Sequence, residues 1–402
     1  MATWSLKRMD ELCEITSSKR IFAADYVSEG VPFYRGREIT ERYRGNLEVS
    51  TELFITEEKF RDIERKFGAP KQGDLLLTSV GTLGSVYVVK VGDRFYFKDG
   101  NLTWFRHFKE LDSQFLYYWI GSPQGKAELQ KCTIGSSQSA FTIVLLKSME
   151  IELPPISIQQ RIASILSAYD ELIENNQRRI KILETMARNL YREWFVHFRF
   201  PGHENHPRVD SPLGEIPQGW EVGRLDDVLV LQRGFDLPKS SRIEGTVPII
   251  AATGVTGFHN EAKVKAPGVV TGRSGTIGEV LYIQEDFWPL NTSLWVKAFP
   301  NGEPLYGYYL LSSLDLKQFN SGAAVPTLNR NDIHGISVVI PPRDEQVHFQ
   351  DIAGAMHTQS RFLKFKTENL RQTRDLLLPR LLSGQITVPE AADDLTQVTS
   401  HA

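Results

Sequence analysis

The sequence predicts an α+β chain in which two mixed α/β globular segments, related by a pseudo-twofold axis, are separated by two long antiparallel coiled-coil helices. Two observations lead to this prediction. Residues 154–197 and 341–384 each carry a heptad pattern that follows a Pro-Pro pair. The globular segments that precede them, residues 1–153 and 220–340, share short motifs in the same order, which indicates an internal duplication.

The first long helix is predicted to start after Pro154 and Pro155, with Ser157 as its N-cap. Two rows of mainly apolar residues then recur every seven positions, the second row four residues after the first. The rows are Ile162, Tyr169, Asn176, Leu183 and Leu190, and Leu166, Ile173, Ile180, Ala187 and Trp194. A helix of about 38 residues would be on the order of 55 Å long, so this one needs a packing partner.

The partner is predicted to lie in the same chain. A shift of 187 residues places Pro341-Pro342 on the first Pro-Pro pair and Gln346 on Gln159. The seven-residue step returns in Phe349, Met356, Leu363, Leu370 and Leu377. Gly384 is predicted to end this helix, because glycine commonly follows a helix C-terminus. The matched starts and register favour an intramolecular pair over two unrelated helices that pack on separate domains.

The globular segments resemble each other in their motifs. Gly81-Thr-Leu-Gly84 returns as Gly275-Thr-Ile-Gly278, and in each copy two β-rich runs flank this glycine turn. The offset between the copies is 216 residues from Trp4 to Trp220 and 194 residues between the two glycine turns. The first copy therefore has 22 extra residues in this interval. We place them at residues 51–72, which include a short charged helix. Residues 198–219 are predicted to be a linker, and 385–402 a polar tail.

Composition excludes several classes of protein. Hydrophobic content of 41% and charged content of 24% are ordinary for a soluble protein, and no apolar 18-residue window predicts a membrane span. Two cysteines give no disulfide framework, which fits a reducing cytoplasm. A net charge of -3 argues against a non-specific nucleic-acid coat protein, but permits a specific binder with local positive charge. Since no catalytic or metal-ligating constellation stands out, a self-sufficient enzyme is disfavoured.

Polar loops occupy matched places in the two copies. Glycine allows the backbone to approach a phosphate closely, and polar side chains bind base edges or the DNA backbone. Most such loops are only turns, but their repetition with different residues favours two readers of two short sequences. The candidate DNA-contacting residues are Arg35, Arg37, Ser79, Thr82, Lys98, Ser137 and Gln138 in the first copy, and Thr253, Arg273, Ser274, Thr276 and Thr327 in the second.

The order of these motifs resembles the specificity subunit of Type I DNA restriction-modification systems. The likeness is carried by the two Gly-Thr-x-Gly turns, the two Pro-Pro helix starts and two further stretches, residues 191–202 and 378–384. It covers nearly the whole chain. Each motif alone is weak, whereas their order and duplication are specific.

The resemblance implies a non-catalytic subunit in which each globular segment is a target recognition domain and the long helices are conserved spacers. Its target would be a bipartite, asymmetric sequence of double-stranded DNA. Its partners would be two methylation subunits, which use S-adenosylmethionine, and restriction subunits, which use ATP with Mg. It would bind no cofactor itself and act in the cytoplasm of a bacterium or archaeon. The alternative is a coiled-coil adaptor that binds proteins without reading DNA.

Overall fold

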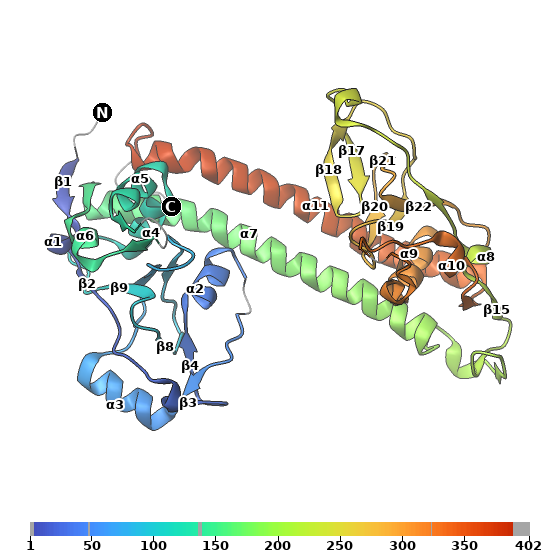
Figure 1. Cartoon of the computed structure of the whole chain (residues 1–402), viewed down its shortest axis with the longest axis horizontal. Coiled ribbons are helices and arrows are strands. Elements are labelled where there is room, and N and C mark those ends of the chain that lie inside the picture. The colour runs from blue at the N-terminus through green and yellow to red at the C-terminus, as the bar shows by residue number, and fades with distance from the viewer. Residues whose placement is uncertain (1–3, 47–48, 136–138, 323, 389–402) are drawn as a thin grey trace, which may run out of the picture. The chain divides into compact units, whose positions relative to one another are not determined.

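The computed structural model in Figure 1 describes residues 4–46, 49–135, 139–322 and 324–388. The chain forms two compact units. Unit 1 comprises residues 1–176 and 366–402, and unit 2 comprises residues 177–365. Each unit contains one globular segment and a part of both long helices, α7 (Ile156–Tyr191) and α11 (Arg343–Leu382).

Unit 1 contains two four-stranded sheets with the orders β2-β9-β6-β7 and β3-β5-β4-β8, and the separate pairs β1-β12 and β10-β11. Its strands are β1 (Ser5–Arg8), β2 (Glu14–Thr16), β3 (Tyr26–Val27), β4 (Val31–Tyr34), β5 (Phe54–Ile55), β6 (Leu75–Thr78), β7 (Val86–Val88), β8 (Tyr96–Phe97), β9 (Leu102–Arg106), β10 (Thr133–Ile134), β11 (Ala140–Phe141) and β12 (Glu150–Leu153). Its helices, besides the long ones, are α1 (Met9–Leu12), α2 (Gly36–Tyr43), α3 (Glu57–Phe67), α4 (Ser113–Gly121), α5 (Pro123–Lys131) and α6 (Ile143–Ser148). Helix α3 is the charged helix predicted in the insertion.

Unit 2 repeats this topology with the sheet β16-β22-β19-β20, the sheet β18-β17-β21 and the pair β15-β23. Its strands are β13 (Arg208–Val209), β14 (Ile216–Pro217), β15 (Glu221–Arg224), β16 (Val230–Arg233), β17 (Val247–Ala251), β18 (Gly254–His259), β19 (Gly268–Gly272), β20 (Val280–Ile283), β21 (Trp288–Pro289), β22 (Ser293–Ala298) and β23 (Ser337–Ile340). Its short helices are α8 (Leu225–Val228), α9 (Pro304–Ser313) and α10 (Arg330–His334). The predicted fold class of repeated mixed α/β domains with long helices is confirmed.

Each central sheet is buried on both faces, because its side chains alternate between two cores. In unit 1, Leu75 and Leu77 join the core that includes residues of α4, α7 and α11, whereas Leu76 joins the core beside α2 and β8. In unit 2, Val269 packs in the core of α9 and α11, and Val270 packs against β17. Leu75 corresponds to Val269 and Leu76 to Val270 at the same offset of 194 residues, so the duplication extends to the packing of the side chains.

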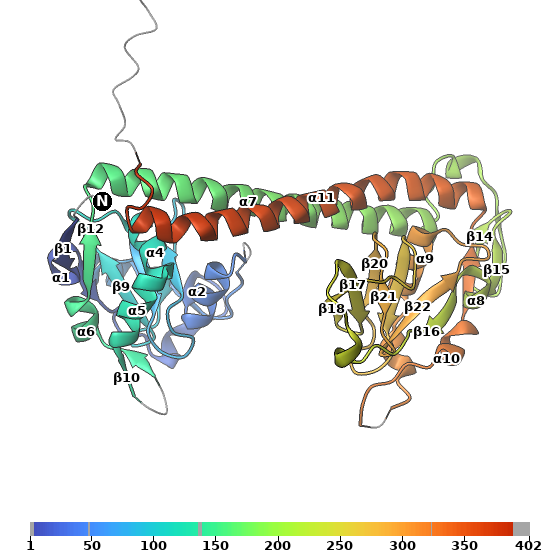
Figure 2. The ribbon, with the colours of Figure 1, turned by 90° about the horizontal axis from the view of Figure 1, so that it is seen from above.

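The heptad seam predicted for the long helices is confirmed. All fifteen predicted seam residues are buried or half-buried in the two helices and the turn that follows α7. In unit 1, Asp170 of α7 accepts a hydrogen bond from Arg374 of α11. In unit 2, Glu184 pairs with Lys364, and Trp194 lies against Phe349, so the two helices run in opposite directions (Figure 2).

The ends of the long helices differ in one respect from the prediction. Helix α7 starts at Ile156, so Ser157 lies inside the first turn and is not the N-cap. Helix α11 ends at Leu382, and Gly384 follows with a φ of +67°, which is the expected glycine stop. The predicted linker also packs onto unit 2, where Phe200 and Ile216 are buried. Residues 389–402 of the predicted tail lie outside the described residues.

Matched glutamines fasten each globular segment to its long helix. The side chain of Gln159 donates to the carbonyls of Glu110 and Pro154 and accepts the N–H of Asp112. At the position 187 residues later, Gln346 donates to Asn301 and Pro341 and accepts from Glu303. Both side chains are fully buried, and every one of these bonds satisfies a backbone group near a helix start. The duplicated sequence motif thus encodes a duplicated anchor.

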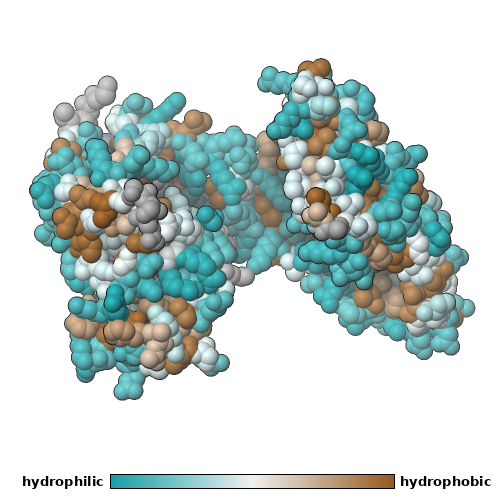
Figure 3. All heavy atoms as spheres, viewed as in Figure 1, coloured by the Kyte–Doolittle hydropathy of each residue, from teal (hydrophilic) through white to brown (hydrophobic). Residues whose placement is uncertain are grey.

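The surface is mixed in polarity. In the view of Figure 3, hydrophobic residues form patches that hydrophilic residues separate. Within the described part of the chain, no helix combines the length and the apolar character needed to cross a membrane.

Candidate nucleic-acid interface

Several candidate residues of unit 1 follow the ends of two parallel strands. Strands β4 and β8 pair in parallel, with Tyr34 opposite Phe97. The N–H of Lys98 donates to the carbonyl of Tyr34 over 2.9 Å. Because the carboxyl ends of parallel strands lie at one edge, Arg35 and Lys98 leave the sheet side by side.

A matched pair of backbone hydrogen bonds draws three polar loops together in both units. In unit 1, Ser79 donates to the carbonyl of Asn101 and accepts from the N–H of Phe141. In unit 2, Arg273 donates to Thr292 and accepts from Leu328 in the same way. The loops that the sequence pairs across the two copies are therefore brought to the same place in each unit.

The side chains at this matched position differ sharply. Ser79 is only 3% exposed, and its hydroxyl lies 2.7 Å from the Thr103 hydroxyl. The Arg273 side chain is half-buried and donates through Nη1 to the carbonyl of Asn291. Ser79 thus supports its loop from inside the unit, and its predicted direct contact with DNA does not fit this burial. Arg273 remains accessible.

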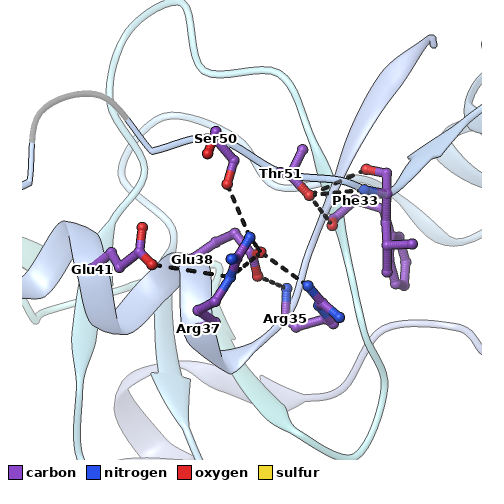
Figure 4. Close-up of polar contacts among 8 residues, drawn as sticks. Phe33, Arg35, Arg37, Glu38, Glu41, Ser50 and Thr51 are labelled. Atoms are coloured by element: carbon purple, nitrogen blue, oxygen red, sulfur yellow. Dashed lines mark hydrogen bonds and ion pairs between the residues drawn. The ribbon is translucent and has the colours of Figure 1, made fainter. Parts of the chain in front are cut away.

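Arg35 and Arg37 converge on one buried carboxylate, that of Glu38 (Figure 4). Nε and Nη2 of Arg37 lie 3.1 and 3.0 Å from Glu38 Oε1, and Nη2 also donates to the carbonyl of Ser50. The Arg35 N–H donates to Glu38 Oε2 over 2.8 Å. The hydrogen bond to Glu38 is the main reason that the pKa of Arg37 is raised. Two candidate arginines therefore share one anchor.

The remaining candidates of unit 1 are less constrained. Thr82 and Lys98 are exposed, and among the described residues no carboxylate lies within 4.0 Å of the Lys98 ammonium. Ser137 and Gln138 lie outside the described residues.

Unit 2 contains an open cleft of about 1170 Å³. Its lining comes mainly from β16 and the loop that follows it, from β22, and from α10 with the segment that leads into it. Two of the candidates, Arg273 and Thr327, line the cleft. The other polar and charged lining residues are Gln232, Arg233, Asp236, Lys297, Ser321, Asn329, Arg330, Asn331 and His334.

The cleft has an excess of positive charge. Arg233 has a distant partner in Asp236, at 3.9 Å. For Arg273, Lys297 and Arg330, no carboxylate of the described residues comes within 4.0 Å. Three uncompensated cations beside asparagine side chains suit a polyanion with hydrogen-bonding edges.

The other candidates of unit 2 occupy turns. Thr253 is exposed in the turn between β17 and β18, and Thr276 lies in the turn between β19 and β20. Neither lines the cleft. Ser274 forms a β-bridge with Thr327, which brings the glycine turn against the loop before α10.

The sequence interpretation missed Glu38 and most cations of the cleft. Glu38 had a local signal, because a residue three positions after a helix N-cap can accept the N–H of that cap. Arg233, Lys297 and Arg330 had no such signal, since strands and a helix far apart in the sequence bring them together.

The fold and the site define a duplicated protein in which each α/β unit presents its own polar loops and adjoins a shared pair of long helices. The family described as the Type I restriction modification DNA specificity domain matches residues 1–185 and 217–372. The chain belongs to this family, whose members are specificity subunits of Type I restriction enzymes.

Individual relatives agree with this assignment. The chain is 26% identical to the Type I restriction enzyme MjaIX specificity subunit of Methanocaldococcus jannaschii, over 96% of this chain and 94% of that protein. It is also 28% identical to the 'Putative type I restriction enzyme specificity subunit S.HindORF215P' of Haemophilus influenzae, over 45% of this chain and 44% of that protein. The crystal structure of the Type I S subunit from M. genitalium has a TM-score of 0.67 at 19% identity, covering 94% of this chain and 96% of that one. That likeness concerns the fold.

Proposed function

We propose that this chain is a non-catalytic DNA-reading subunit that recognises a bipartite, asymmetric target, with one half read by each unit. The observation that carries the proposal is the pair Ser79 and Arg273. Their backbones make the same pair of hydrogen bonds in the two copies of the fold, yet the Ser79 side chain is buried and the Arg273 side chain is accessible. Two domains that share one fold but carry different side chains in their loops would read different sequences, which makes the target asymmetric.

The charge of the loops supports DNA as the ligand. The cleft of unit 2 offers three cations without carboxylate partners among the described residues, and unit 1 offers Lys98 and the Arg35–Arg37 pair. Arginine donates to guanine edges and to phosphates, and lysine binds phosphate as a point charge. These are the side chains from which a DNA reader is built.

The long helices suit the role of a spacer in this proposal. Each helix contributes to both units, and the buried Gln159 and Gln346 fasten a globular segment to each one. The helices would then set the gap between the two half-sites and carry the docking surfaces for two methylation subunits. Restriction subunits would join that complex.

In this proposal the chemistry belongs to the partners. The methylation subunits would use S-adenosylmethionine, and the restriction subunits would use ATP with Mg. An adenine must leave the duplex to be methylated, so the task of this chain would be to place the partner's pocket beside the right base.

The test is co-expression with a candidate methylation subunit from the same genome, followed by genome-wide mapping of N6-methyladenine. The expected result is a split, asymmetric motif that appears only when this chain is present. If methylation is unchanged without this chain, or the motif is continuous and symmetric, the proposal is wrong. An adaptor that binds only proteins would then explain the duplicated helices better.

A further inference from the structure

Glu38 is a buried carboxylate at the first turn of α2, beside the candidate loop of unit 1. Its side chain is 0% exposed. A buried carboxylate is tolerated only where donors surround it, because desolvation of the charge is otherwise costly. One of its oxygens, Oε2, accepts the N–H of Arg35 over 2.8 Å and caps the helix.

The second oxygen binds the guanidinium groups of both arginines. Oε1 lies 3.1 Å from Nε and 3.0 Å from Nη2 of Arg37, and 3.5 Å from Nη2 of Arg35. Two guanidinium groups share one buried carboxylate, which leaves one positive charge in excess at this anchor. Glu41 and Glu52 are further acidic groups near Arg37. The ion pair with Glu41 measures 4.0 Å and is partly exposed, so it compensates this excess only weakly.

The two arginines keep donors available on the open side. Their side chains are 36% and 45% exposed. Within the described residues, Nη1 of each arginine has no hydrogen-bond acceptor, and the buried Nε of Arg35 has none either. Figure 4 shows both side chains meeting at Glu38. Nη2 of Arg35 and both Nε and Nη2 of Arg37 are thus bonded to Glu38, and Nη1 of each arginine is left to donate to an acceptor. The unpaired Nε of Arg35 is buried and faces the protein interior.

We propose that Glu38 is a positioning residue that holds Arg35 and Arg37 ready to donate to acceptor atoms of the first half of the DNA target. The inference rests on the proposed function and assigns part of the reading to a side chain that does not touch DNA. The acceptors are either guanine O6 and N7 or phosphate oxygens, which share the same chemistry. Fixing the arginines before binding reduces the side-chain entropy that binding costs.

Glu38→Gln separates positioning from capping. Glutamine has the same shape, and its carbonyl can still accept the Arg35 N–H, so the cap of α2 is retained. Its amide group would face the guanidinium donors of Arg37 and cannot accept from them. Glu41→Gln is the matched control, since it removes one negative charge from the same helix and only the 4.0 Å contact with Arg37, while the shorter bonds to Glu38 stay.

The experiment uses the full chain assembled with its methylation subunits and duplexes that carry the mapped target. Binding is measured for the target and for duplexes altered in the first or in the second half-site, at several salt concentrations. We expect Glu38→Gln to bind the target about tenfold more weakly, with its preference for the second half-site unchanged. A melting temperature above the assay temperature shows that the variant is folded. Glu41→Gln should bind the target with wild-type affinity.

The pattern of loss identifies the acceptor. If the arginines read bases, discrimination against an altered first half-site falls. If they hold phosphates, affinity falls equally for every duplex, and the salt slope decreases by about 1. Either pattern supports the positioning role.

Wild-type affinity and discrimination in Glu38→Gln would overturn the inference while leaving the proposed function intact. If that variant fails to fold, Arg37→Lys replaces it: this change keeps the charge but loses the two-nitrogen contact with Glu38. Arg37→Lys should then lose affinity comparably, and wild-type behaviour would again overturn the inference. A wild-type complex without preference for any duplex would instead refute the proposed function.

Discussion

Removing the two exposed cations of the cleft that have no carboxylate partner among the described residues should weaken the salt dependence of DNA binding. The change is the double variant Lys297→Ala/Arg330→Ala. Both side chains line the cleft, and in the described residues neither has a carboxylate within 4.0 Å, so each is free to neutralise a phosphate. Since each phosphate contact contributes about 0.9 to the slope of log affinity against log salt, the double variant should lose about 1.8 of slope.

This loss of slope can be converted into an affinity ratio. Between about 50 and 200 mM salt, the wild-type complex should lose about 12-fold more affinity than the double variant, because each contact accounts for about 3.5-fold. The assay is equilibrium binding of a labelled duplex to the complex with its methylation subunits, at four or more salt concentrations.

A matched control removes the same charge from elsewhere in unit 2. Lys263 and Lys265 are paired with Glu261 and Asp286 at 2.5 and 2.6 Å, and neither lines the cleft. Lys263→Ala/Lys265→Ala should keep the wild-type slope. If the cleft variant has the wild-type slope, or the control loses as much slope, the cleft does not hold phosphates and the reasoning from its uncompensated charge is wrong.

Two further predictions concern stability. Gln346→Ala should lower the free energy of unfolding, measured in urea titrations, by about 2–4 kcal/mol, because two carbonyls and one N–H lose their buried hydrogen-bond partner. The control Gln318→Ala, at an exposed site in the same unit, should leave the free energy of unfolding unchanged. Burial lowers the pKa of His357 from 6.5 to about 4, so the folded histidine stays neutral while the unfolded one takes up a proton. Its contribution is therefore present above pH 6.5 and lost as the pH falls toward 4, at most about 3 kcal/mol. His357→Gln should reduce that acid sensitivity, and an unchanged profile would show that other groups cause it.

The parts of the fold that repeat a pattern could be predicted from the sequence. The heptad seam and the two glycine turns depend on local periodicity and on residues such as Gly384 whose conformational preference is strong. The start of α7 was misplaced by two residues, because Ser157 is a favoured cap and the sequence does not show that the helix already begins at Ile156.

The site was predictable in outline only. Arg273 was among the residues predicted to contact DNA, and the structure leaves it accessible in a cleft. The burial of Ser79 could not be foreseen, because its hydroxyl lies against Thr103 of β9, which pairs with β6, and β6 ends one residue before Ser79. The cations of the cleft were missed for the same reason: tertiary packing, not spacing along the chain, gathers Lys297 and Arg330.

The most direct measurement of the central claim is the methylation motif written by cells that carry Arg273→Ala. If unit 2 reads its own half-site, the variant motif should be relaxed or lost at bases of one half only, while the other half and the gap stay as in the wild type. If both halves change together, the claim that each unit reads one half is contradicted. If methylation falls evenly at every site with the motif preserved, Arg273 holds the DNA backbone and its role in reading bases is refuted.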